Sequence, residues 1–326
     1  MQEPTEETAV SPRRTLRDYA GIALRGMAMG ASDIVPGVSG GTMAFILGIY
    51  EELIDSLRMI GEPAFLRALF RFQIKEVFRL LNWPFLLAVF GGILAAIFTL
   101  SHGLEWLLVH QPVLLWSFFF GLVLASVFAV GRRIQNWRTA VHLTMAAAAV
   151  VAYLLVGAAP THTPNTWWFL MLSGAVAICA MILPGISGAF ILVLLGKYQF
   201  VLSAVNNRDF LTIGFIGIGA VMGLVTFAQI LSRLFKRHHD LTVAGLTGLM
   251  LGSLRKVWPW KEDVAWLVDD SGQYMLSHGE RIVTEQLNIL PDAAGEPLQV
   301  IFAILLTLTG LGAVLLIERL AHQASN

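Results

Sequence analysis

Long apolar runs recur along the chain and are separated by shorter polar stretches. These runs cover residues 82–101, 112–131, 140–159, 210–232, 241–258 and 298–318. Each is close to the length of about 20 residues that crosses roughly 30 Å of hydrocarbon as a helix rising about 1.5 Å per residue. Helices on a soluble core carry a polar face, and these runs lack one. The pattern predicts an all-α, polytopic integral membrane protein.

One motif, Pro-Gly-x-Ser-Gly, occurs twice, and both copies lie inside strongly apolar sequence. The first copy runs from Pro36 to Gly40, and the second runs from Pro184 to Gly188. The same offset continues further along, where Leu47, Gly48 and Tyr50 recur as Leu195, Gly196 and Tyr198. A helix-breaking motif that is duplicated within apolar sequence is typical of transporters that bind their substrate between two internal repeats.

The repeat extends beyond this motif, at a shorter offset. The matched residues are Gly92, Thr99, Leu104, Gly121, Leu122, Leu124 and Ser126, which correspond to Gly219, Thr226, Leu231, Gly248, Leu249, Leu251 and Ser253. The first copy therefore holds extra residues, which fit in the basic stretch 51–82. We expect a first repeat at 19–159 and a second repeat at 160–320, flanked by a polar N-terminal segment at 1–18 and a tail at 321–326.

Basic residues determine the expected topology, because lysine and arginine concentrate in cytoplasmic loops. They lie on both sides of the first motif, at Arg13, Arg14, Arg17 and Arg25 and at Arg58, Arg67, Arg71, Lys75 and Arg79. If both flanks are cytoplasmic, segment 19–57 enters the membrane and returns on the same side as a re-entrant helical hairpin. Its tip is then at Pro36 and Gly37. Segment 166–205 is expected to form the matching hairpin, with Pro184 and Gly185 at its tip.

Each half then contains one re-entrant hairpin and three transmembrane helices. Because three is an odd number of crossings, the second repeat is expected to be inverted relative to the first. The N- and C-termini are both predicted to be cytoplasmic. The acidic segment 259–297 becomes the longest outer loop, either a solvated cap or a gate or partner surface.

The two motifs are candidate anion sites. Proline and glycine end one half-helix, and the next half-helix begins near Ser39, where free N–H groups, hydroxyls and the positive end of the helix dipole favour an anion. The candidate residues are Ser39, Gly40, Gly41, Thr42, Ser187 and Gly188. In the second copy Ala189 and Phe190 replace Gly41 and Thr42, which predicts a drier site there. The alternative interpretation is that the small residues only allow close helix packing.

Ionisable residues within apolar sequence are costly and therefore informative. Arg25 lies two helical turns before Asp33, so an ion pair between them is one hypothesis. The other assigns Arg25 to an anionic substrate and Asp33 to proton or cation coupling. Lys197 follows the second motif, where its side chain either meets a phosphate from the outer side or extends to the membrane interface.

Composition excludes several other classes of protein. The single cysteine, Cys179, excludes an intramolecular disulfide, and the net charge of zero gives no reason to expect nucleic-acid binding. We find no Walker loop, Rossmann fingerprint or metal-ligand cluster, so we expect no cofactor and no metal site. Gly-x-Ser-Gly is also the signature of rhomboid-type intramembrane proteases, which need a histidine base on another span. His142 alone lies near a span, so we expect no catalytic residues and no enzyme activity.

The motifs resemble the paired signatures of one membrane-protein family. Residues 30–42 read Gly-Ala-Ser-Asp-Ile-Val-Pro-Gly-Val-Ser-Gly-Gly-Thr and are followed by Gly48-Ile49-Tyr50. Residues 179–188 read Cys-Ala-Met-Ile-Leu-Pro-Gly-Ile-Ser-Gly and are followed by Gly196-Lys197-Tyr198. These signatures resemble those of the PopT-type polyprenyl-phosphate translocases of bacterial and archaeal cytoplasmic membranes, and the resemblance covers roughly residues 19–320.

The resemblance implies transport of undecaprenyl phosphate from the outer to the cytoplasmic leaflet, which returns this lipid carrier for synthesis of peptidoglycan and other envelope polymers. It places the head group at the motif residues, with Asp33 and Arg25 nearby. Two other hypotheses remain open from the residues themselves. One is a secondary transporter of a small soluble anion, and the other is an intramembrane hydrolase. The sequence carries no indication of oligomeric state.

Overall fold

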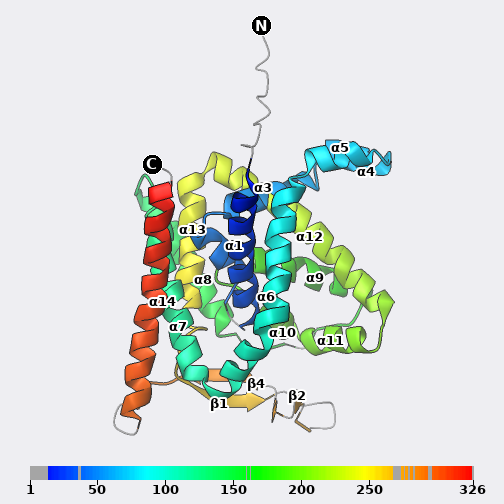
Figure 1. The fold of residues 1–326 in the computed structure, drawn as a ribbon. Coiled ribbons are helices and arrows are strands. Elements are labelled where there is room, and N and C mark those ends of the chain that lie inside the picture. The colour runs from blue at the N-terminus through cyan, green and yellow to red at the C-terminus, as the bar shows by residue number, and fades with distance from the viewer. Residues whose placement is uncertain are drawn as a thin grey trace.

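The computed structural model describes residues 14–35, 38–158, 160–161, 163–266, 273–274, 276–277, 280–281, 283–292 and 296–324, and helices dominate them (Figure 1). The helices are α1 (Leu16–Ile34), α2 (Gly40–Ile46), α3 (Tyr50–Met59), α4 (Pro63–Phe70), α5 (Ile74–Leu80), α6 (Trp83–His110), α7 (Pro112–Gly131), α8 (Thr139–Val156), α9 (Trp167–Ile182), α10 (Gly188–Leu194), α11 (Tyr198–Asn206), α12 (Phe210–Arg237), α13 (His239–Ser253) and α14 (Pro297–Ala324). The strands are β1 (Lys261–Trp266), β2 (Leu276–Ser277), β3 (Glu280–Arg281) and β4 (Val283–Asn288).

Five helices of the described chain are long and apolar enough to cross a membrane, namely α6, α7, α8, α12 and α14. They coincide with five of the six predicted crossings, so a polytopic helical membrane protein is confirmed. The sixth run, 241–258, differs, because α13 ends at Ser253 after 15 residues. At about 1.5 Å per residue such a helix is only about 22 Å long. The chain then turns towards β1 instead of extending the helix.

Eight of the helices pack as four pairs. Two of these pairs make their closest contacts at equivalent positions of the two repeats. α1 packs mainly on α6, and α9 packs mainly on α12. A Cβ atom on Gly92 of α6 would collide with the carbonyl oxygen of Ala23, and a Cβ atom on Gly219 of α12 would collide with that of Met171. Gly92 and Gly219 are matched positions of the repeat. Close backbone approach at glycine is how helices pack tightly in a membrane. The other pairs are α7 with α14 and α8 with α13.

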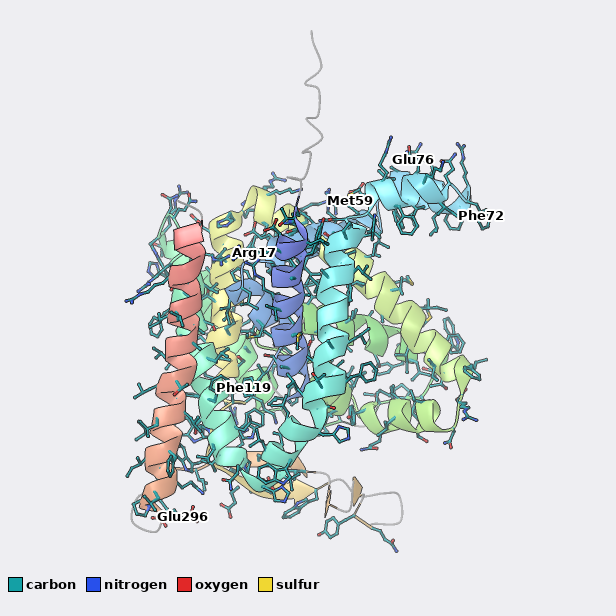
Figure 2. The ribbon with its side chains drawn as sticks, viewed as in Figure 1. Arg17, Met59, Phe72, Glu76, Phe119 and Glu296 are labelled. Carbon is teal, nitrogen blue, oxygen red and sulfur yellow. The ribbon has the colours of Figure 1, made fainter. Side chains whose placement is uncertain are left out.

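The first motif segment doubles back on itself. Arg14, just before α1, forms a bidentate salt bridge with Glu52 on α3, with N–O distances of 2.6 and 2.7 Å. Arg17 near the start of α1 and Met59 at the end of α3 accordingly lie at one end of the molecule, and Glu296 lies at the other end (Figure 2). The end of α14 shares the first of these ends (Figure 1).

Glycines make the turns after both motifs. Gly48 between α2 and α3 has φ of +73°, and Gly196 between α10 and α11 has φ of +64°. Glycine adopts positive φ without the steric cost that other residues bear. The turn at Gly196 bends α11 by 110° relative to α10. The matched glycines of the repeat therefore serve the same local purpose.

Two smaller features complete the described fold. α4 and α5 project sideways from the helices, in the stretch where the first copy holds its extra residues (Figure 1). Phe70 and Phe72 are exposed there. At the opposite end, β1 pairs with β4 in antiparallel register, from Lys261 opposite Asn288 to Trp266 opposite Val283. These strands lie in the segment 259–297, where we expected an outer loop. We call this the strand-bearing end.

Candidate functional site

The first motif starts a short helix that is buried from Gly40 to Phe45 and whose leading N–H groups are already bound. The N–H of Gly40 donates to the carboxylate of Asp33 at 2.7 Å. The N–H of Gly41 donates to the side-chain oxygen of Ser39 at 3.1 Å, and the N–H of Thr42 donates to the Ser39 carbonyl oxygen at 2.9 Å. Asp33 thus occupies the place that a bound anion would take at the start of α2. The predicted tip residues Pro36 and Gly37 lie outside the described residues.

The hydroxyl groups of the first motif bind the backbone of the second. Ser39 Oγ lies 3.4 Å from the Met181 carbonyl oxygen and 3.3 Å from that of Leu183. Thr42 Oγ1 accepts a hydrogen bond of 2.9 Å from the N–H of Gly185. A Cβ atom on Gly41 would lie 2.5 Å from the Ile182 carbonyl oxygen, so only glycine allows this approach.

A tyrosine that we did not predict as a site residue makes the same kind of contact. The hydroxyl of Tyr50 donates to the Ile182 carbonyl oxygen at 3.1 Å, and its side chain is buried. Its ring packs against Phe45, with 4.9 Å between ring centroids. The sequence did mark Tyr50, because it recurs as Tyr198. The recurrence alone does not show that the hydroxyl crosses to the other repeat.

The second motif is less closely bound by the rest of the protein. Pro184 is buried, and Gly185 has φ of +89°. Ser187 precedes α10 and is half-buried, and its hydroxyl has no hydrogen-bond partner within the described chain. A Cβ atom on Gly188 would lie 2.6 Å from the Ala177 carbonyl oxygen, so α10 leaves the tip in close contact with α9. The N–H groups of Gly188, Ala189 and Phe190 make no backbone hydrogen bond among the described residues.

The ion pair that we considered between Arg25 and Asp33 is absent from the described residues, and Lys197 lies in an unexpected environment. Arg25 is exposed on α1 and forms no salt bridge with Asp33 or with any other described carboxylate. Eight residues separate them, or about 12 Å along a helix, and Asp33 is turned to the start of α2 instead. The side chain of Lys197 is buried instead of extending outwards. Its buried amino group donates to the carbonyl oxygen of Thr163 at 2.6 Å and to the side chain of Asn165.

The structure therefore brings most of the predicted site residues to one place. Ser39, Gly41 and Thr42 contact residues 181–185, and the N–H of Gly40 donates a hydrogen bond to Asp33. Ser187 and Gly188 follow this contact directly. Within the described residues, no group of three histidine, cysteine, aspartate or glutamate side chains is arranged to hold a metal ion. The polar groups at this contact include the hydroxyls of Ser39 and Thr42 and backbone N–H groups.

Known proteins are similar to this chain in sequence. The profile of a family described as undecaprenyl phosphate translocase-like matches residues 29–275. A polyprenyl-phosphate transporter of Vibrio cholerae serotype O1 is 43% identical over 310 residues, which are 94% of this chain and 98% of the relative. A polyprenyl-phosphate transporter of Staphylococcus aureus is 31% identical over 260 residues, which are 72% of this chain and 85% of the relative. No solved structure matches the chain.

The match to the family profile spans both motifs and the residues that join them, and the Vibrio cholerae relative aligns over nearly the whole chain. The resemblance drawn from the two signatures is therefore confirmed: the chain belongs to the undecaprenyl phosphate translocase-like family.

Proposed function

We propose that this protein carries undecaprenyl phosphate from the outer to the cytoplasmic leaflet of a bacterial membrane and binds the head group at the paired motif tips. The relatives named polyprenyl-phosphate transporters support the substrate class. One observation carries the proposal for the site, namely the hydrogen bonds by which Ser39, Thr42 and Tyr50 join the first motif to the backbone of the second. A polar centre built from two broken helices is tolerated in a membrane only where protein or water surrounds it.

We assign different tasks to the two motifs. The first motif has satisfied its leading N–H groups with Asp33 and Ser39, so it holds the second tip in place. The second motif presents the Ser187 hydroxyl and the N–H of Gly188, which have no protein partner in the described chain. A phosphate monoester accepts hydrogen bonds from such groups. Head-group contact therefore falls on Ser187 and Gly188.

An inverted repeat is part of the same proposal. The equivalent packing of α1 on α6 and of α9 on α12, through Gly92 and Gly219, supports a common origin of the halves. The bidentate pair of Arg14 with Glu52 supports a first segment that enters and leaves at one end of the molecule. With the basic flanks taken as cytoplasmic, both termini lie in the cytoplasm and the strand-bearing end faces outwards.

Transbilayer movement of undecaprenyl phosphate in proteoliposomes tests this function. Wild-type protein is expected to equilibrate the lipid between leaflets, and Ser187→Ala is expected to slow it at least tenfold without loss of folded protein, because Ser187 makes no internal hydrogen bond in the described chain. Ser101→Ala, on the lipid-crossing helix α6, is the matched control and is expected to behave as wild type. A wild type that leaves the lipid in place while moving a soluble anion would overturn the substrate assignment.

A further inference from the structure

Three basic side chains surround a small cavity at the strand-bearing end. Arg255 and Lys256 lie in the turn after α13, and Lys261 begins β1. The cavity has a volume of about 50 Å³, and Phe190 of α10 and Gln286 of β4 also line it. Four separate segments of the chain thus meet at one polar space.

These cations have no salt-bridge partner in the described part of the chain. None of the three forms a salt bridge with a described carboxylate. The amino group of Lys261 is buried and has no hydrogen-bond partner in the described part of the chain. It lies 3.8 Å from the centre of the Trp116 ring, and the amino group of Lys256 lies 5.2 Å from that of Phe190. Buried charges without a paired group are costly and are normally compensated by a bound ion or partner.

The neighbouring carboxylate supplies only part of that compensation. Asp263 is exposed, and its Oδ1 atom accepts a hydrogen bond of 2.7 Å from Gln286. Burial and the charge of Lys256 lower the pKa of Lys261 to about 7, against which Asp263 acts only partly. Burial likewise lowers the pKa of Lys256. Both shifts are those of a desolvated basic site that lacks an anion.

Arg255 is held in a defined orientation. Its Nη1 atom donates to the Tyr153 carbonyl oxygen at 3.2 Å, and its guanidinium lies 4.5 Å from the centre of the Tyr153 ring. A Cβ atom on Gly157 would collide with the guanidinium, so the glycine leaves room for Arg255 in this orientation. The remaining N–H groups of a fixed guanidinium suit a planar or tetrahedral oxyanion.

Residues near both motifs lie close to the cavity or to its basic side chains. A Cβ atom on Gly185 would lie 2.7 Å from Ser253 Oγ, two residues before Arg255. Phe190 on the cavity wall is in the first turn of α10, directly after the second motif. Trp116, which lies under Lys261, belongs to a buried cluster with Val35 and Val38, which flank the first tip. The cavity wall therefore includes Phe190, which lies two residues after Gly188 of the proposed head-group site.

We propose that Arg255, Lys256 and Lys261 form a binding site for a phosphate monoester, which receives the lipid head group at the strand-bearing end before it passes to Ser187 and Gly188. The lipid identity of the ligand rests on the proposed function. The site itself rests on three cations around one cavity that have no salt-bridge partner in the described chain. Free phosphate shares the chemistry of the head group, so the experiment separates these two sources.

Binding to purified protein in nanodiscs is measured with three probes, namely undecaprenyl phosphate, undecaprenol and inorganic phosphate. Lys256→Met/Lys261→Met is expected to weaken undecaprenyl phosphate binding at least tenfold and to leave undecaprenol binding unchanged. Lys256→Arg/Lys261→Arg keeps both charges and is expected to retain binding, which separates lost charge from lost folding. Lys75→Met, on the exposed surface of α5, is the matched control and is expected to bind as wild type.

Each outcome has one meaning. Lysine-dependent binding of inorganic phosphate, with lipid binding unaffected by the methionine variants, would overturn the head-group site and leave a site for free phosphate. Unchanged binding of both phosphate probes would overturn the proposal altogether. If wild type binds undecaprenyl phosphate through these lysines but does not move it across proteoliposomes, the proposed function fails and this site stands. If wild type moves the lipid and the methionine variants move it equally fast, only this inference fails.

Discussion

The backbone N–H of Gly185 donates a hydrogen bond to the hydroxyl of Thr42, across 2.9 Å and between the two halves of the chain. Both groups are buried, so neither has water as an alternative partner. The bond fixes the second tip, where Gly185 adopts a φ of +89°, against the first turn of α2. This bond therefore links the conformation of the second tip to the first turn of α2.

Thr42→Val tests this dependence, because valine keeps the shape of threonine and removes the acceptor. The buried N–H of Gly185 would lose its partner, which costs about 1–3 kcal/mol. We expect a lower thermal unfolding temperature and slower lipid transport. The control is Thr99→Val, since Thr99 is exposed on α6 and its hydroxyl bonds only to the Ala95 carbonyl oxygen of the same helix. Equal unfolding temperatures for the two variants would contradict the importance of the Thr42 bond.

The glycine contacts of the helix pairs make a second prediction. Gly219→Ala places a methyl group against the Met171 carbonyl oxygen, and Gly92→Ala does so at the equivalent contact. Overpacking of this kind costs about 1–3 kcal/mol, so both variants are expected to unfold at lower temperature. Gly217→Ala and Gly91→Ala meet nothing within 4 Å and serve as neighbouring controls. They are expected to be neutral or stabilising, since alanine favours a helix by up to about 1 kcal/mol.

The position of chain segments relative to the membrane makes a third prediction. In a Cys179→Ala background, Arg14→Cys and Glu52→Cys are expected to react with an impermeant thiol reagent from the same side, because the native side chains are 2.6 Å apart. Glu262→Cys, on exposed β1, is expected to react from the other side only. The measurement is labelling of right-side-out and inverted vesicles. Labelling of all three positions from one side would exclude the proposed topology.

The pH dependence of phosphate binding makes a fourth prediction. The pKa of Lys261 is about 7 in the free protein, lowered by burial and by Lys256, with Arg255 adding positive charge to the same cavity and Asp263 opposing them. As pH rises through 7 the lysine loses its proton, so affinity for a phosphate monoester is expected to fall between pH 7 and pH 9. Binding restores the proton, because the anion favours the charged lysine.

The matching control for this pH dependence is Lys261→Arg. Arginine stays charged throughout this range, so its affinity is expected to decline far less between pH 7 and pH 9 than that of wild type. Binding titrations at fixed ionic strength measure the difference. Parallel pH profiles for the two proteins would show that Lys261 is not the group that titrates.

Much of the molecule follows from local rules that can be read along the chain. Apolar runs of membrane length predicted six crossings, and five of them coincide with helices long and apolar enough to cross a membrane. The rule works because a helix in hydrocarbon must satisfy its own backbone and expose apolar side chains. Gly48 and Gly196 were matched in the repeat, and both adopt positive φ. The paired Pro-Gly-x-Ser-Gly motifs indicated the family and the region of the site. Periodicity, proline and glycine carry this information because they act on residues a few positions apart.

Long-range contacts decided the rest. The sequence left two roles open for Asp33, namely an ion pair with Arg25 and proton or cation coupling. Only the path of the chain into α2 shows that Asp33 binds the N–H of Gly40. From the sequence, Lys197 was expected either to meet a phosphate or to extend to the membrane interface. The fold buries its amino group, which donates to the Thr163 carbonyl oxygen. In the sequence, Lys261 is one basic residue within the acidic segment 259–297. These outcomes depend on which segments the fold brings together, and local sequence does not encode such distances.

The sequence by itself thus determined the class of the protein, its repeated motifs and the residues that break its helices. The tertiary structure decided which of those residues bind protein and which remain available to a ligand. It closed the first motif with Asp33, left the Ser187 hydroxyl without a protein partner in the described chain, and placed Lys256 and Lys261 around one cavity. The physical reason is that a hydrogen-bonding group or a charge acquires its role from its neighbours, and in this chain those neighbours lie far away in sequence.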